Sequence, residues 1–296
     1  MPLLQEPIQR KLSALLGAEC SFEKLNFSLL GGSIDASGVK ISADAKLPAV
    51  LTIARVRAQV AIGRALKGEI VITSLTIEKP VLNFVRLVDG TSNLPKRFRP
   101  AAQVNAPARS DAGGELPDTN RWKLDATKVL LIDGALSLND GSLPGGRYQW
   151  SAGPILAELN RTAGGYSTTL IADNVCQLET TTSVGSIRMN GSFDNAADLT
   201  AIPRASANLM VEIGSLFKGK IISPSLASKV IELTGHGGID AKQLIGLLPP
   251  GAVPPALASL SGQLQFDLSA RNEPASGITV SELNLRGVGL GMKLPF

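Results

Sequence analysis

His236 is the only histidine in the chain, and imidazole is the side chain that ordinarily titrates near neutral pH. It could act as a general base if a carboxylate oriented it and a Ser or Cys nucleophile lay beside it. The surrounding sequence, Thr-Gly-His-Gly-Gly, supplies neither partner in a recognisable motif. The flanking glycines predict a turn, where histidine tolerates unusual backbone dihedrals. The sequence therefore predicts no catalytic site at His236 and no enzyme.

Two Asp-Gly pairs could be taken for metal-binding carboxylates. Asp89-Gly90 and Asp133-Gly134 both follow apolar runs, and a tight β-turn explains both pairs without a ligand. The segment RGVGLG, residues 286–291, has glycines at alternate positions but lacks the strand-to-helix context of a phosphate-binding loop. It predicts a strand that is bulged or weakened by glycine. We expect no metal and no cofactor.

Cysteine and charge usage argue against two further classes of protein. Cys20 and Cys176 lie far apart without Cys-x-x-Cys spacing, which argues against a zinc site and leaves open a disulfide or two separate buried thiols. The net charge is +4, and Lys96, Arg97 and Arg99 form the only tight basic cluster. Such a cluster could contact phosphates, but no aromatic residues are interleaved with it to stack on bases. We predict a solvated loop there and no nucleic-acid partner.

The composition that must position these side chains is that of a β protein. Apolar residues make up 44% of the chain and aromatic residues 4%, with 30 glycines and 18 prolines. Runs rich in Val, Ile, Leu and Thr, broken by turn residues, predict mostly strands. No run of 18 apolar residues occurs, so no membrane-spanning helix is expected.

Residues 51–94 give the clearest strand signal. Apolar and polar residues alternate from 52 to 60, with Arg55 and Arg57 on the polar face, which is the period of a half-buried strand. We predict three strands here, with a helical turn at 62–66. The alternation continues after the turn with small shifts of phase. The apolar face predicted for this segment comprises Val56, Ala58, Val60, Ile70, Ile72, Leu75, Ile77, Leu82 and Phe84.

The rest of the chain predicts a helix, a linker and a series of short strands. Leu4, Ile8, Leu12, Leu15 and Leu16 fall on one face of a helix over residues 2–16, which Pro7 should limit to its second half. This helix could cap the open end of a β core or lie on a membrane surface. Residues 96–120 predict a loop or linker between segments 1–95 and 121–296. Helices are expected at 223–233 and at 240–248, the second with Asp240 as its N-cap.

The order of these elements resembles the AsmA-like family of bacterial envelope proteins, which includes TamB-type proteins and is distantly similar to chorein-type lipid-transfer proteins. The resemblance is carried by an ordered series of segments, each of which alone is only a hairpin or a helix. In chain order they are GAECSFEKLNFSLLGGSIDASGVKI, LKGEI, VITSLTIEKP, VDGTSNL, KVLLIDGALSLND, IDAKQLIGLLP and LSGQLQFDLSA.

The resemblance implies a mainly β fold, in which a long curved antiparallel sheet forms an open apolar groove with an N-terminal capping helix and a few short helices. It implies that the groove holds phospholipid acyl chains and takes part in phospholipid transport between the inner and outer membranes. It further implies a periplasmic, inner-membrane-associated protein, although the family's N-terminal anchor is not in this sequence. Contacts with a membrane surface through the N-terminal helix, and with envelope proteins, are also expected. The alternative is a non-catalytic structural or assembly factor for outer-membrane proteins.

Overall fold

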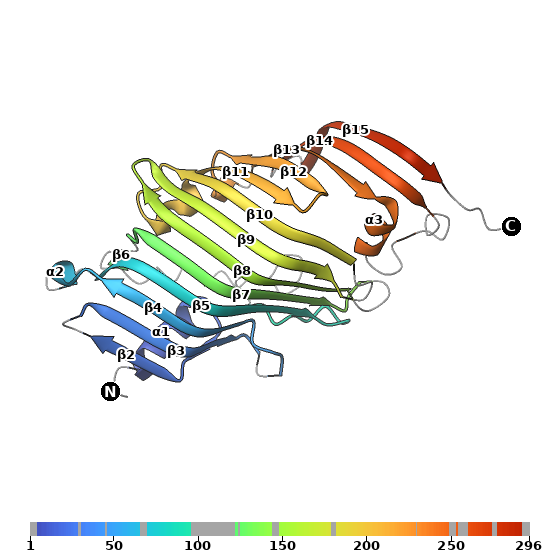
Figure 1. Cartoon of the computed structure of the whole chain (residues 1–296). Coiled ribbons are helices and arrows are strands. Elements are labelled where there is room, and N and C mark those ends of the chain that lie inside the picture. The colour runs from blue at the N-terminus through green and yellow to red at the C-terminus, as the bar shows by residue number, and fades with distance from the viewer. Residues whose placement is uncertain are drawn as a thin grey trace.

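The computed structural model describes residues 5–28, 31–44, 46–65, 70–95, 122–123, 125–143, 148–178, 182–228, 230–248, 253, 260–273 and 277–291. The fifteen strands of this part form one open, curved sheet. The strands follow one another nearly in chain order from the blue end of the sheet to the red end (Figure 1). The predicted mainly β fold and curved sheet are therefore confirmed.

The N-terminal elements are α1 (Gln5–Leu16), β1 (Glu19–Ser21), β2 (Lys24–Ser28), β3 (Ser33–Ser42), β4 (Leu51–Val60), α2 (Ile62–Ala65), β5 (Ile70–Arg86) and β6 (Trp122–Lys123). The middle strands are β7 (Lys128–Asp140), β8 (Tyr148–Thr162), β9 (Gly165–Gln177) and β10 (Thr182–Asp194). The remaining elements are η5 (Leu199–Arg204), β11 (Ser206–Ile213), β12 (Phe217–Ser223), η6 (Leu226–Ser228), β13 (Ile231–Asp240), α3 (Ala241–Leu247), β14 (Ser261–Glu273) and β15 (Gly277–Gly291).

Two strand pairings depart from the antiparallel sheet that we predicted. β5 and β7 pair in parallel, from Ser74 beside Lys128 to Arg86 beside Asp140, and the short β6 also pairs in parallel with β5. The other described ladders are antiparallel. A parallel pair needs a long crossover connection, which residues 87–127 supply. The predicted linker at 96–120 falls within that connection and outside the described residues.

Residues 51–94 form two strands where we predicted three. β5 is one strand of 17 residues that contains all the apolar positions predicted after the helical turn. Similarly, Asp133-Gly134 does not separate two strands but lies inside β7, where the register against β8 shifts. The predicted turn there is wrong because a bulge, which also uses residues with positive φ, keeps the strand continuous.

The predicted helix at 223–233 is also wrong. Among the described residues of this range, only Leu226–Ser228 form a short helical turn, and strands β12 and β13 lie on either side of it. His236 therefore lies within β13 and not in a turn, paired with Lys218 on one side and Asp267 on the other. The predicted N-cap is confirmed, because the Asp240 carboxylate accepts a hydrogen bond from the Lys242 backbone N–H at 2.9 Å.

The N-terminal helix is longer than we predicted. α1 begins at Gln5, and Pro7 lies in its first turn, where a missing N–H breaks no intrahelical bond. Gly17 ends the helix with φ +65°, and its N–H donates to the Ser13 carbonyl at 2.9 Å. The Ser13 hydroxyl also accepts from the Cys20 N–H at 2.8 Å, which fixes α1 against β1. Leu4 and the side chains of Ile8, Leu15 and Leu16 lie outside the described part, and Leu12 is exposed.

Residues with positive φ line up across neighbouring strands, and we call this line the crease. The strand register places Lys79 of β5 beside Asp133 of β7, and Asn174 of β9 close to Gly185 of β10. At the crease the apolar alternation changes by one residue, for example between Ile77 and Leu82, which explains the phase shifts in the sequence. The members of the crease are Gly38, Lys79, Asp133, Gly153, Asn174 and Gly185.

The turn after β5 is held by one buried side chain. Asp89 and Gly90 form a tight turn, as predicted, in which the Leu87 N–H donates to the Thr91 carbonyl at 2.7 Å. Asn93, which is fully buried, then contacts three backbone groups. Its amide nitrogen donates to the carbonyls of Pro48 (3.2 Å) and Asn83 (2.6 Å), and its oxygen accepts from the Val85 N–H (2.9 Å). This side chain ties the end of β5 to the segment before β4.

Candidate functional site

Two rows of apolar side chains cross the sheet from β2 to β15 on one face. Paired residues on neighbouring strands point to the same face, so the register assigns each row. Row A is Leu25, Ala36, Val56, Ile77, Leu131, Ala157, Leu170, Met189, Val211, Gly219, Gly235, Leu268 and Leu283. Row B is Phe27, Ile34, Ala58, Leu75, Val129, Leu159, Thr168, Gly191, Leu209, Ile221, Leu233, Ala270 and Val280. Thr168 is the one polar member of the two rows, and neither row contains a charge.

The residues between rows A and B point to the opposite face and are mostly polar or charged. Only Leu130 and Met210 are large apolar members of this intervening row. Its members are Asn26, Asp35, Arg57, Thr76, Leu130, Glu158, Thr169, Asn190, Met210, Lys220, Thr234, Ser269 and Glu282. The sheet therefore has one apolar face and one polar face along its length.

A third row widens the apolar face over the second half of the sheet. Row C is Ile155, Ala172, Ile187, Ile213, Phe217, Gly237, Phe266 and Leu285. Strands lie about 4.8 Å apart, so the twelve steps of rows A and B span roughly 58 Å; three rows two residues apart cover roughly 13 Å of strand length. These dimensions describe a long, narrow apolar strip.

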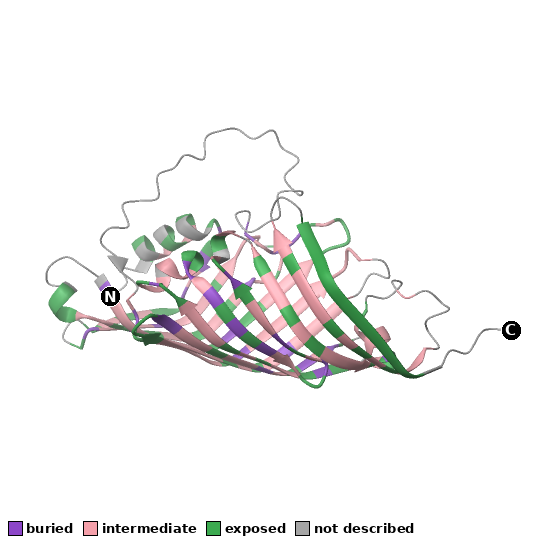
Figure 2. Ribbon diagram, turned by 90° about the horizontal axis from the view of Figure 1, so that it is seen from above, coloured by how far each residue is buried: buried purple, intermediate pink, exposed green. Residues whose placement is uncertain are grey.

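Short helical segments cover the strip only locally. η5 packs on it at one side, where its Leu199 and Ile202 join Leu159 in a cluster around the buried Tyr166. Leu247 of α3 packs against the larger cluster that contains Ile187 and Phe217. Figure 2 shows the curved sheet from above, with most strand residues half-buried or exposed. The described strands belong to one layer, without a second sheet over the apolar face.

The structure brings four of the nine predicted apolar residues into the rows of this strip. Val56 and Ile77 are in row A, and Ala58 and Leu75 are in row B. Leu82 and Phe84 lie on the other side of the crease from Ile77. Leu82 pairs with Leu136, and Leu136 packs against the same hydrophobic cluster as several residues of row C. Val60 pairs with Ile72 across a register shift. Ile70 pairs with Trp122, and its side chain lies outside the described part.

Sequence reasoning expected the groove to continue through residues 121–296, but it named strip residues only in β4 and β5. The missed strands have the same period-2 pattern, for example Leu209 and Val211 around Met210 in β11. Leu209 and Val211 are buried, whereas Met210 is 38% exposed. Alternation alone could have found these positions, but glycines at 219, 235 and 237 interrupt it in β12 and β13. Their Cβ positions would overlap the Phe217 and Phe266 rings, which lie over the glycines on the apolar face.

Ion pairs across neighbouring strands stabilise the polar face. The Arg55 guanidinium binds the Asp35 carboxylate and, by that hydrogen bond, lowers the pKa of Asp35. Lys128 Nζ lies 2.7 Å from Glu158 Oε1 and lowers the pKa of that carboxyl in the same way. These pairs are partly exposed, so each stabilises the fold only weakly. Opposite charges on neighbouring strands favour the observed register, in which rows A and B share the apolar face.

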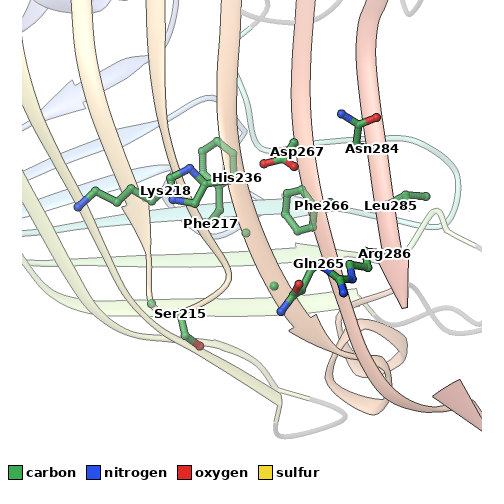
Figure 3. Close-up of a pocket in the computed structure, with 13 residues that line it drawn as sticks. Ser215, Phe217, Lys218, His236, Gln265, Phe266, Asp267, Asn284, Leu285 and Arg286 are labelled. Atoms are coloured by element: carbon green, nitrogen blue, oxygen red, sulfur yellow. The ribbon is translucent and has the colours of Figure 1, made fainter. Parts of the chain in front are cut away.

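A hollow of about 700 Å³ lies at the C-terminal end of the sheet, between β12 and β15 (Figure 3). Its lining includes Arg286 and also His236 and Asp267, which are paired with each other on the adjacent strands β13 and β14. Within the described residues no hydrogen bond or ion pair joins His236 to another side chain. Lys218 is engaged elsewhere, because its Nζ lies 2.6 Å from Glu212 Oε1. Among the described residues, the hollow therefore presents polar groups that no side-chain hydrogen bond joins to His236.

Other site chemistry is limited in the described part of the chain. No group of three or more His, Cys, Asp or Glu side chains is placed to hold a metal there. Cys20 on β1 and Cys176 on β9 are both free, and burial raises the pKa of the Cys20 thiol. None of the described helices combines the length and the apolarity needed to cross a bilayer. Neither the family models nor the curated proteins that were compared with this chain gave a match.

Proposed function

We propose that the apolar strip formed by rows A, B and C binds the acyl chains of lipids, and that the protein moves phospholipid between the inner and outer membranes. The observation that carries this proposal is the continuity of rows A and B over thirteen strands without a charge. Each CH₂ group that a lipid tail places on such a surface is stabilised by about 0.8 kcal/mol. Exposed apolar areas of this size usually mark a binding surface.

The resemblance to AsmA-like proteins supports the same function and adds its location. We propose that the strip is the floor of an open groove, that α1 caps its N-terminal end, and that the protein acts in the periplasm in association with the inner membrane. The lipid headgroup has no charged partner in rows A to C. The strip therefore selects for acyl chains.

The first experiment measures bound lipid. Protein purified from bacterial cells in a mild detergent is exchanged into detergent-free buffer and examined by native mass spectrometry and organic extraction. We expect co-purified phospholipid. Protein that is folded but free of lipid would support the competing function, in which the apolar face packs dry against a protein partner.

A matched pair of variants separates the two faces of the sheet. Leu130 and Leu131 are adjacent, half-buried leucines in β7, and only Leu131 belongs to row A. Leu131→Asp places a carboxylate in the path of a lipid tail, where desolvation costs several kcal/mol, so phospholipid transfer between vesicles should slow at least tenfold. Leu130→Asp should leave the transfer rate within about twofold. Equal effects of two folded variants would contradict the proposal.

A further inference from the structure

Among the described strands, β15 forms one edge of the sheet, and this edge is long. β15 pairs with β14 along one side, and no described strand pairs with its other side. Edge strands are usually shortened or carry Pro or Lys, which prevents pairing with another chain. β15 has fifteen residues, none of them Pro or Lys. Leu283 and Leu285, its members of rows A and C, are 53% and 65% exposed.

The centre of β15 is complementary to itself in the antiparallel direction. The segment Glu-Leu-Asn-Leu-Arg, residues 282–286, has Asn284 at its middle. When two copies pair with Asn284 opposite Asn284, Leu283 lies opposite Leu285 and Glu282 lies opposite Arg286. Symmetry repeats each of these contacts. Both ion pairs then lie on the polar face, and both leucine pairs lie on the apolar face.

The local geometry suits this pairing. From residue 282 to residue 288 the register of β15 against β14 is regular, and the shifts lie only outside this run. The Asn284 amide donates to Glu282 Oε1 at 2.8 Å, which holds the carboxylate along the strand. No ion pair within the described residues engages Arg286. The charges that a second copy would meet are therefore available.

Other arrangements fit less well. A shift by two residues in either direction places Glu282 opposite Asn284 or Arg286 opposite Asn284, and both charge pairs are lost. Larger shifts place Glu282 opposite Glu282 or Arg286 opposite Arg286, and like charges directly opposite destabilise a sheet. Among the described strands, the other edge of the sheet offers only β2, of five residues, and β1, of three. A head-to-tail contact would thus leave most of β15 unpaired.

We propose that β15 pairs with β15 of a second copy of this chain, in the register centred on Asn284, to form a twofold-symmetric dimer. A twofold axis perpendicular to the sheet keeps both apolar faces on the same side, so rows A and C continue from one copy into the other. The inference is independent of lipid binding, since it depends on the edge and the charges of β15. A lipid-free dimer would satisfy it.

Disulfide trapping tests the register directly. In a Cys20→Ser, Cys176→Ser background, Asn284→Cys places two thiols opposite each other, with Cβ atoms about 5 Å apart. We expect mild oxidation to convert most of this variant to a covalent dimer. Thr279→Cys is the matched control on the same strand, because its two copies would lie about 33 Å apart. Equal trapping of both variants, or of neither, would overturn the proposal.

Charge exchange tests the contact without a new bond. Analytical ultracentrifugation of the unmodified chain should show a monomer–dimer equilibrium. Glu282→Arg and Arg286→Glu should each weaken dimerisation at least tenfold, since each places two like-charge pairs in the contact. The double variant E282R/R286E restores opposite charges and should return the dissociation constant to within about threefold. The pairing would be refuted if the chain stayed monomeric at roughly 100 μM or formed an open-ended polymer. It would also be refuted if neither single variant changed the dissociation constant of the dimer.

Discussion

The Asn93 side chain provides the sharpest test of how the sheet is held at the end of β5. Asn93→Ala removes three hydrogen bonds to the backbone, to Pro48, Asn83 and Val85, at a fully buried position. Each bond contributes about 1 kcal/mol net, so the local free energy of opening should fall by about 3 kcal/mol. That is a roughly 100-fold larger opening constant. Hydrogen exchange followed by mass spectrometry of the peptides covering residues 80–95 measures it.

Two further variants make this test specific. Asn93→Asp keeps the oxygen that accepts from the Val85 N–H but turns a second oxygen toward two carbonyls, so it should accelerate exchange at least as much as alanine. Asn208→Ala is the control, because it removes an exposed asparagine on β11. Its effect on the local free energy of opening should be less than about 0.5 kcal/mol. An effect of Asn93→Ala below tenfold would refute the role assigned to this side chain.

Three other changes test packing, capping and charge. Gly237→Ala should lower the free energy of unfolding by about 1–3 kcal/mol, measured in urea, because its Cβ overlaps neighbouring backbone; the control Gly238→Ala meets its nearest atom at 3.7 Å and should change little. Asp240→Ala should cost about 1 kcal/mol and Asp240→Ser should restore most of it, since Ser also caps helices. The Arg55 hydrogen bond lowers the pKa of Asp35, so its stabilisation is present above the unfolded pKa of about 3.9 and is lost as pH falls through the lower folded value. Asp35→Asn should therefore reduce the decline of the melting temperature below about pH 4, and an unchanged acid profile would contradict the pairing.

The sequence predicts this fold well where the signal is local. The alternation in β4 places Val56 and Ala58 on one face, and the register confirms that they share it. The cap at Asp240 was visible because it depends on residues within one turn of a helix. The period of two and the chemistry of caps are properties of neighbouring residues, so one chain segment is enough to reveal them.

The prediction fails where the deciding contact comes from elsewhere in the chain. Gly235 and Gly237 resemble turn residues, but they lie in a strand because the Phe217 and Phe266 rings occupy the space over them. The parallel pairing of β5 and β7 has no hairpin signature, because its partners are joined by a long crossover. Lys79 lies in a strand and adopts positive φ, which cannot be predicted from its residue type. These features depend on three-dimensional packing, and so does the extension of the apolar strip to β15.

The parallel ladder between β5 and β7 also determines the order in which the chain can fold. Every residue in it is 54 positions from its partner, as the end pairs show (128 − 74 = 54 and 140 − 86 = 54). In an antiparallel hairpin the first pair forms beside the turn, so the loop to be closed is short, whereas this ladder has no short loop from which to start. Contacts between distant residues slow folding. We therefore expect the strands before and after this ladder to assemble as two hairpin arrays, and their joining at β5 and β7 to be the late, slow event that makes one sheet of the molecule.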